Sequence, residues 1–359
     1  MRVRTVIVSC MALGLAYLLG WPVAVEPQAW TPPPAPALHG QWAPNLALAS
    51  TRRIFTDGHG IPEDVAIGPD QYVYAGTSDG SILRMAQDGS APQVLVNTGG
   101  RPLGMRFAPD GSLWVADGDK GLLRVTSDGH ISVLATHADG VSFKLTDDLD
   151  VAVDGKVYFT DASYRFSFHD YQSDLLEHRA NGRLLEYDPV TRQTRVLLKD
   201  LYFANGVAIS PDQTFLLVVE TGEYRVTRYW LNGAKAGHRE VFIDNLPGVP
   251  DGISSNGRDT FWVALPTPRL SDLDKLLPHP FLRKMVARLP KVLQPKPTPM
   301  GFVIGLDLNG KVTHNLQDPD GQSYATITNV IEQNGKLWFG SLYEQAVGVL
   351  PVTDLPKTK

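Results

Sequence analysis

The chain has 359 residues, of which 43% are hydrophobic, so it can bury a large core and is not expected to be disordered or fibrous. Its 33 basic and 38 acidic residues leave a formal net charge of −5, which argues against a nucleic-acid partner. The 33 glycines and 27 prolines favour an all-β chain with many tight turns. A single cysteine, Cys10, excludes a disulfide framework within the chain.

The first segment of the chain predicts export across a membrane. Residues 5–25 are uncharged and follow Arg2 and Arg4, and a run of this length can span a bilayer as a helix. Residues 1–26 are therefore predicted to be a signal anchor or a signal peptide, and we favour the anchor because the run ends in a poor cleavage site. The remainder would be periplasmic, extracellular or lumenal, held to the membrane by this segment, or secreted if the segment is cleaved. The proline-rich residues 27–49 predict an extended, semi-rigid stalk.

From about residue 60 a pattern recurs six times: a small or polar pair, a β-branched run, a Pro-Asp or Asp-Gly turn, and a strand with aromatic residues. Each copy is typical of a β-hairpin, and further β-like runs follow several of them. Four strands at a spacing of about 40 residues indicate a β-propeller blade. The copies lie at 62–76, 101–117, 146–161, 203–220, 249–265 and 327–342. We predict an all-β, six-bladed β-propeller over residues 50–359.

Two features complete this propeller. The last repeat lacks an outer strand, and we expect residues 51–57, which read as the end of a blade, to supply it and close the ring. Long intervals between repeats hold insertions at 162–181 and 266–300. The second has helical apolar spacing interrupted by prolines, so we predict a short helical insertion in blade 5 that covers one side of the channel mouth. It would either pack only on the blades or also contact the membrane.

Alignment of the repeats on their turns places six residues at equivalent positions in the first strand of each blade. Because this strand lines the central channel, the six positions form a ring, and four of them carry oxygen: Glu63, Asp147, Asn205 and Asp251. Buried like charges repel one another, and a hard cation such as Ca²⁺ would compensate them. The alternative is that these residues recur only as turn formers, but the Asp-Gly turns lie in the next loop along.

Five segments of the chain resemble a known family. They are PEDVAIGPDQYVYAG (62–76), LTDDLDVAVDGKVYFTD (145–161), DLLEHRANGRLLEYDPVT (174–191), LYFANGVAISPDQ (201–213) and LPGVPDGIS (246–254). Together they resemble the strictosidine-synthase-like proteins, the family of the adipocyte plasma membrane-associated protein. That family is related to the six-bladed, calcium-dependent hydrolases of the senescence marker protein-30, gluconolactonase and paraoxonase type.

The resemblance implies a function and a site. Those hydrolases hold a metal with one Glu, two Asn and one Asp, which by motif fall on Glu63, Asp147, Asn205 and Asp251, with Asp147 standing where Asn is usual. It implies a hydrolase of small lactones or esters, of lactonase or arylesterase type, that depends on Ca²⁺ or another divalent cation. Asp251 would activate water. We also expect a monomer.

Three alternatives stay open. A non-catalytic, membrane-tethered binding propeller would use the cation only structurally. A strictosidine-synthase-like lyase is the weaker alternative, because the family's catalytic Glu falls at Thr328, whose hydroxyl has no evident activator. Resemblance to paraoxonase also suggests a second, deeper cation near Asp64 and Asp148, which is not part of the predicted site.

Overall fold

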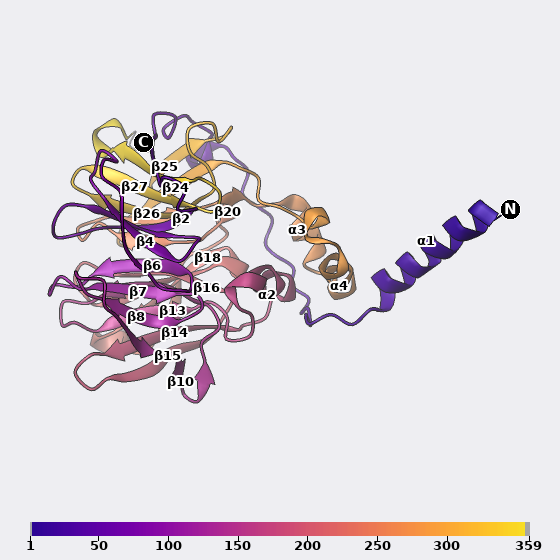
Figure 1. Ribbon diagram of the computed structural model, residues 1–359, viewed down its shortest axis with the longest axis horizontal. Coiled ribbons are helices and arrows are strands. Elements are labelled where there is room, and N and C mark those ends of the chain that lie inside the picture. The colour runs from indigo at the N-terminus through magenta and orange to yellow at the C-terminus, as the bar shows by residue number, and fades with distance from the viewer. Residues whose placement is uncertain (1, 356–359) are drawn as a thin grey trace.

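The computed structural model describes residues 2–355, which form six four-stranded antiparallel sheets arranged as the blades of a propeller (Figure 1). The predicted six-bladed propeller is therefore confirmed. The first strands of the blades, β2, β6, β12, β16, β21 and β26, contact one another in this order around the axis, and β26 contacts β2. These strands lie where the repeat pattern begins in each copy.

The strands of the six blades have the following bounds. Blade 1 contains β2 (Pro62–Ile67), β3 (Val73–Thr77), β4 (Ser81–Met85) and β5 (Gln93–Asn97), and blade 2 contains β6 (Pro102–Phe107), β7 (Leu113–Asp117), β8 (Gly121–Val125) and β9 (Ile131–Ala135). Blade 3 contains β12 (Thr146–Val151), β13 (Val157–Asp161), β14 (Gly182–Asp188) and β15 (Gln193–Leu201), and blade 4 contains β16 (Ala204–Ile209), β17 (Phe215–Glu220), β18 (Arg225–Trp230) and β19 (Arg239–Ile243). Blade 5 contains β21 (Ile253–Ser255), β22 (Phe261–Ala264), β24 (Gly301–Leu306) and β25 (Val312–Asp318), and blade 6 contains β26 (Ile327–Gln333), β27 (Lys336–Ser341), β28 (Ala346–Pro351) and β1 (Arg52–Phe55).

The ring is closed by a strand from the opposite end of the chain. β1 pairs antiparallel with β28, with Arg52 opposite Val349 and Phe55 opposite Ala346. This confirms the prediction that residues 51–57 supply the outer strand of blade 6. Closure in this way joins the first and last parts of the propeller and covers an edge that could otherwise pair with another chain.

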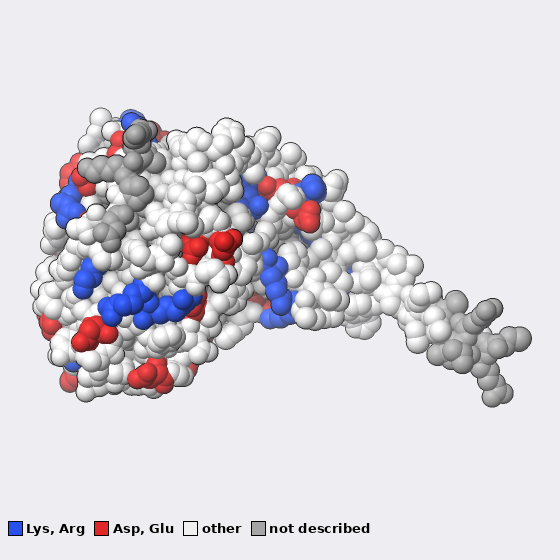
Figure 2. All heavy atoms as spheres, turned by 90° about the horizontal axis from the view of Figure 1, so that it is seen from above, with Lys and Arg blue, Asp and Glu red and all other residues white. Residues whose placement is uncertain are grey.

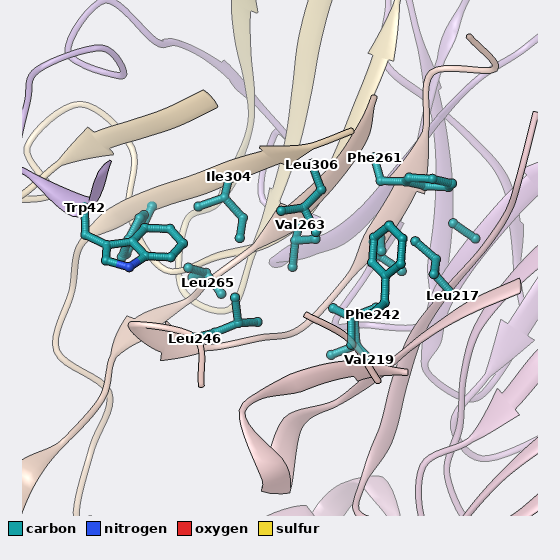
Figure 3. Close-up of a cluster of buried hydrophobic side chains, with 14 of the residues drawn as sticks. Trp42, Leu217, Val219, Phe242, Leu246, Phe261, Val263, Leu265, Ile304 and Leu306 are labelled. Carbon is teal, nitrogen blue, oxygen red and sulfur yellow. The ribbon is translucent and has the colours of Figure 1, made fainter. Parts of the chain in front are cut away.

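The core lies between neighbouring blades, which pack face to face. β17, in the middle of blade 4, is buried along its whole length, whereas the outer strand β5 of blade 1 is exposed or half-buried. A strand covered on both faces reads as a continuous apolar run, and this explains the sequence FLLVVE of β17. Between blades 4 and 5, Phe242, Phe261 and Leu306 pack in one cluster, which Trp42 from the N-terminal segment extends (Figure 3).

Helices gather on one side of the propeller (Figure 1). They are α2 (Tyr171–Glu177) in the first insertion, and α3 (Ser271–Leu276) and α4 (Pro280–Arg288) in the second. A two-stranded pair, β20 (Gly248–Val249) with β23 (Thr267–Pro268), lies at the base of the second insertion, and β10 (His137–Ala138) pairs with β11 (Val141–Ser142). Short 3₁₀ helices are η1 (Gly40–Trp42), η2 (Phe168–Asp170), η3 (Thr221–Glu223), η4 (Gly233–Lys235), η5 (Lys291–Leu293) and η6 (Val352–Asp354).

The helix α1 (Arg2–Gly20) projects beyond α4, away from the blades (Figure 1). None of the helices within residues 2–355 combines the length and the apolar character needed to cross a membrane. On the face seen in Figure 2, acidic and basic side chains are interspersed over the propeller, so neither sign dominates.

Part of the proline-rich segment forms no helix or strand and lies on the helices of the two insertions. We call residues 24–36 the N-terminal strap. The backbone amide of Gln28 donates to the Glu177 carbonyl at 2.9 Å, and that of Trp30 donates to the Leu277 carbonyl at 3.2 Å. The Trp30 ring also stacks on His178, with 4.3 Å between centroids. The strap therefore contacts the helices of both insertions.

A buried arginine joins the strap to these helices. The Arg283 side chain, from α4, is fully buried, and its guanidinium donates to the carbonyl oxygens of Gln28, Leu176 and Glu177. Burial lowers its pKa to about 10. Because these carbonyls belong to the strap and to α2, the one side chain connects three separate segments.

We predict that Arg283→Ala lowers the free energy of unfolding by about 2–4 kcal/mol, because it leaves buried carbonyl groups without donors and opens a cavity. Urea denaturation of the full chain measures this change. Lys284→Ala, the same substitution class at the next position of α4, should change stability by less than about 0.5 kcal/mol. Equal stability of the two variants would show that the strap is not held through Arg283.

Candidate functional site

The six equivalent positions of the repeat meet at one small cavity on the channel axis. Its volume is about 10 Å³, and the six residues Glu63, Leu103, Asp147, Asn205, Asp251 and Thr328 all line it. Five of them lie in the first strand of their blade, and Asp251 lies two residues before β21. The structure thus brings the four predicted oxygen donors together, each from a different blade.

Irregular strand pairing aims these side chains at the axis. The register between the first and second strands shifts between Pro62 and Asp64 in blade 1, and between Thr146 and Leu149 in blade 3. Equivalent shifts occur in blades 2, 4 and 6 at the ring position. An extra residue in one strand of a pair bends that strand and redirects its side chains. The repeat pattern in the sequence carried no signal for these bulges.

Glycines beside the ring let the inner strands approach closely. A Cβ atom on Gly104 would lie 2.6 Å from the Asp148 Cα in the next blade, and one on Gly252 would lie 2.6 Å from the Thr328 carbonyl oxygen. Both distances are far below van der Waals contact, so a larger residue would push the blades apart. The ring is narrow for this reason.

Burial and neighbouring negative charges raise the pKa of two ring acids, Asp147 and Asp251. Burial raises the pKa of Asp147 well above its ordinary value, and the charges of Asp251 and Glu63 raise it further. Burial likewise raises the pKa of Asp251, Glu63 adds to the rise, and a hydrogen bond from the Asn205 side chain opposes it. When all three acids are ionised, the ring therefore carries more negative charge than its own groups compensate.

One ring carboxylate already has a partner. The guanidinium of Arg101 donates to Glu63, and the Arg101 and Glu63 side chains are only 6% and 14% exposed. As the side chains stand, residues 2–355 contain no group of three or more His, Cys, Asp or Glu placed to hold a metal ion. The donor set still fits a hard cation, because it consists of three carboxylates and one amide around one cavity. A cation that used Glu63 would compete with Arg101.

A second set of acids lies deeper in the channel and joins blades to one another. Asp64 accepts a hydrogen bond from the Met105 amide of blade 2 at 2.6 Å. Asp148 and Asp150 of blade 3 accept from the amides of Val207 at 3.0 Å and Ile209 at 2.9 Å in blade 4. These carboxylates satisfy backbone donors of first strands that face the channel.

An arginine supplies the positive charge at this level. Arg106 donates to Asp64 at 3.2 Å and lies 4.0 Å from Asp148. The pKa of Arg106 is raised, since the attraction of Asp64, Asp148 and Asp150 outweighs the cost of its burial. The position near Asp64 and Asp148, where a second cation was an alternative, thus already has a guanidinium. The sequence showed only an arginine in a strand, and nothing in the repeat marked it.

Because Arg106 faces several buried carboxylates, we predict that Arg106→Met lowers the free energy of unfolding by about 3–5 kcal/mol. Arg124→Met is the matched control, since Arg124 pairs with Asp110 on the surface of the same blade, where both side chains are about half exposed. That variant should lose less than about 1 kcal/mol. Similar urea midpoints for the two variants would contradict the structural role of Arg106.

A larger cavity of about 170 Å³ lies next to the ring, and we call it the chamber. Both cavities are lined by the four predicted donors and by Leu103. The other walls come from the two insertions and from the loops around them, including Phe168, Tyr171, Leu175, Phe203, Val249, Leu270 and Leu273. The ring therefore forms the floor of a largely apolar space, and α2 and α3 supply part of its walls.

A buried carboxyl group holds α2 in place. Asp174 accepts hydrogen bonds from the Ser163 hydroxyl at 2.6 Å and from the Asn181 side-chain amide at 2.9 Å. Its burial raises its pKa to about 7, and the nearby charge of Glu177 adds to the rise while Arg165 opposes it. Since unfolded Asp has a pKa near 3.9, the folded chain binds this proton more tightly. The stability from this group is complete below about pH 4 and is lost as the pH rises through about 7.

We therefore predict that Asp174→Asn flattens the pH dependence of stability. The wild-type chain should lose about 2–3 kcal/mol from this group between pH 5 and pH 8, and the variant should not. Urea denaturation at both pH values measures the difference. Asp110→Asn, at an exposed acid, is the control and should leave the pH dependence as in the wild type. An unchanged slope in Asp174→Asn would mean that Asp174 does not titrate in this range.

The blade architecture and the axial cavity define the chain as a six-bladed β-propeller of the kind found in several solved structures. A gluconolactonase from Xanthomonas campestris has a TM-score of 0.62 at 20% identity, covering 94% of this chain and 99% of that one. A calcium-binding protein, regucalcin, from Agrobacterium tumefaciens has a TM-score of 0.59 at 15% identity, covering 84% and 93%. At such identities these likenesses show the fold alone.

Sequence comparison gives the family. The family model described as strictosidine synthase matches residues 147–234, and that described as strictosidine synthase-like, N-terminal matches residues 40–85. The Arabidopsis thaliana protein strictosidine synthase-like 6 is 41% identical over 303 residues, 82% of this chain and 80% of its own length. The adipocyte plasma membrane-associated protein of Rattus norvegicus is 34% identical over 352 residues, 92% and 93% of the two chains. The chain belongs to the strictosidine synthase-like family, as its motifs predicted.

Proposed function

We propose that this protein is a hydrolase of lactones or esters that depends on a divalent cation, with calcium as the expected ion. One observation carries the proposal: three carboxylates and an amide from four blades meet at the floor of a chamber large enough for a small molecule. The names of two structural neighbours, a gluconolactonase and a calcium-binding regucalcin, are consistent with this chemistry.

Glu63, Asp147, Asn205 and Asp251 would hold the cation. Their oxygens are the ligands that Ca²⁺ prefers, and the raised pKa values of Asp147 and Asp251 reflect the negative charge that a cation would compensate. Asp147 in place of Asn adds one further charge to the set. When bound, the cation would polarise the substrate carbonyl and stabilise the negative charge that develops on its oxygen.

The residues of the chain would orient water and substrate. Asp251 lines both the ring cavity and the chamber, so it can accept the proton of a water that attacks a carbonyl held above it. The Asn205 side chain is hydrogen-bonded to Asp251 and would fix its orientation. Thr328, where the family's synthases have their Glu, donates its hydroxyl to the Glu63 carbonyl at 2.7 Å. That geometry favours the hydrolase over the lyase.

We also propose where the protein is located. Residues 1–26 would tether it to a membrane with the propeller exported, and the name of the adipocyte plasma membrane-associated relatives supports membrane association. The alternative is a tethered binding propeller that uses the cation only structurally. Turnover separates the two, because both would bind calcium.

We predict that Glu63→Gln and Asp251→Asn each weaken calcium binding by about tenfold or more, because each removes one charge without changing shape. Isothermal titration calorimetry of the full chain measures the affinity. Asp110→Asn, at an exposed acid, should bind calcium as the wild type does. Unchanged affinity in both ring variants would remove the proposed metal site.

The same proteins are then assayed on γ-lactones and phenyl acetate, with and without a calcium chelator. The proposal expects turnover that the chelator abolishes and that Asp251→Asn lacks even at saturating calcium. Full activity of Asp251→Asn at saturating calcium would exclude Asp251 as the proton acceptor. Calcium binding without any turnover would favour the binding propeller.

A further inference from the structure

We propose that the chamber binds a compact apolar group, about the size of one benzene ring or of a chain of six to eight carbon atoms, and that it rejects polyhydroxylated lactones. The inference deepens the proposed function by naming its substrate class. It rests on that function for the reacting carbonyl, whereas binding of the apolar group depends only on the chamber.

The volume of the chamber sets the size of the group. At about 170 Å³ it is close to an engineered apolar protein cavity of about 150 Å³ that binds benzene. A group of this size would fill the space between the ring and the helices α2 and α3. The carbonyl attached to it would then lie at the floor, beside Asp251 and Asn205.

The walls of the chamber are apolar on several sides. Leu103 and Leu145 come from blades 2 and 3, Phe203 precedes blade 4, Leu175 lies in α2 and Leu273 in α3. Leu103, Leu145 and Phe203 are at most 5% exposed, so they are fixed parts of the core. Burial of an apolar group against such walls is favourable and needs no directed polar contact.

Several polar side chains at the walls are already bonded within the protein. The Thr221 hydroxyl donates to the Pro250 carbonyl at 2.8 Å, and the Thr267 hydroxyl donates to the Pro268 carbonyl at 3.2 Å. The Gln294 amide donates to the Leu289 carbonyl at 3.0 Å. A sugar lactone would bring several hydroxyl groups into this space, and each would exchange water for an apolar wall.

A second cavity of about 440 Å³ adjoins the chamber and differs from it in character. It shares Gln172, Leu176 and Gln294 with the chamber, and its other walls include His169, Asp170, Arg288 and Lys291. Charged groups thus line the neighbouring space, whereas the chamber is lined mainly by leucines, prolines and aromatic rings, apart from the acids at its floor and Lys296. Because its walls are mainly apolar, we expect the chamber, and not the neighbouring cavity, to bind the apolar group.

Two ligands that cannot be hydrolysed test the inference. They are 2-hexylcyclopentanone, an apolar ketone shaped like a lactone, and 1,5-anhydro-D-glucitol, a ring of similar size that carries hydroxyls. Calorimetry of the full chain, with and without calcium, should show the ketone binding at least about tenfold more tightly. Equal or tighter binding of the anhydroglucitol would overturn the inference.

Chamber variants assign the binding to this space. Leu273→Trp fills part of the chamber and should weaken ketone binding by about tenfold, and Leu175→Phe gives a second test from the α2 wall. Leu282→Ala, on an exposed part of α4 outside the chamber, is the control and should bind the ketone as the wild type does. Ketone binding that neither chamber variant weakens would overturn the assignment.

The two proposals can fail separately. A protein that binds the ketone in the chamber but hydrolyses no lactone or ester would contradict the proposed function and support this inference. A protein that hydrolyses glucono-δ-lactone as efficiently as a hexyl-substituted lactone would overturn the inference while the hydrolase proposal stands.

Discussion

The structure depends on compensation of negative charge along the channel axis. Six inner strands converge there, and acidic side chains serve as acceptors for the backbone amides of neighbouring blades. Each such carboxylate is costly to bury, and Arg106 offsets that cost at the deeper level. At the ring, Arg101 engages one of three carboxylates, and the pKa values of Asp147 and Asp251 stay high. The excess negative charge is thus concentrated where the chamber begins.

The acids along the axis thus form two groups, a deeper one that joins blades and one at the ring that would bind the cation. Asp64 and Asp148 accept hydrogen bonds from backbone amides of the next blade and lie beside Arg106, so they join neighbouring blades. Glu63, Asp147 and Asp251 line both the ring cavity and the chamber. A site in which like charges remain partly uncompensated has an affinity for cations, and it becomes more stable when one binds. The proposed calcium dependence follows from this arrangement.

The helices of the two insertions and the N-terminal strap form one further unit on this side of the propeller. Arg283 joins the strap to α2 and α4, Asp174 anchors α2, and α3 contributes Leu273 to the chamber. The walls that would recognise a substrate are therefore tied to the segment that leads to α1.

The sequence by itself determined the six-fold repeat, the closing strand and the six ring positions, because a regular spacing places equivalent residues at equivalent points of each blade. Its motifs also identified the family. Only the tertiary structure showed that Arg101 and Arg106 face the axial acids, and that strand bulges turn Glu63 and Asp147 toward the axis. The chamber likewise required the fold, since α2 and α3 come from insertions about a hundred residues apart. Contacts between segments so distant in the chain leave no periodic pattern, whereas the repeat does.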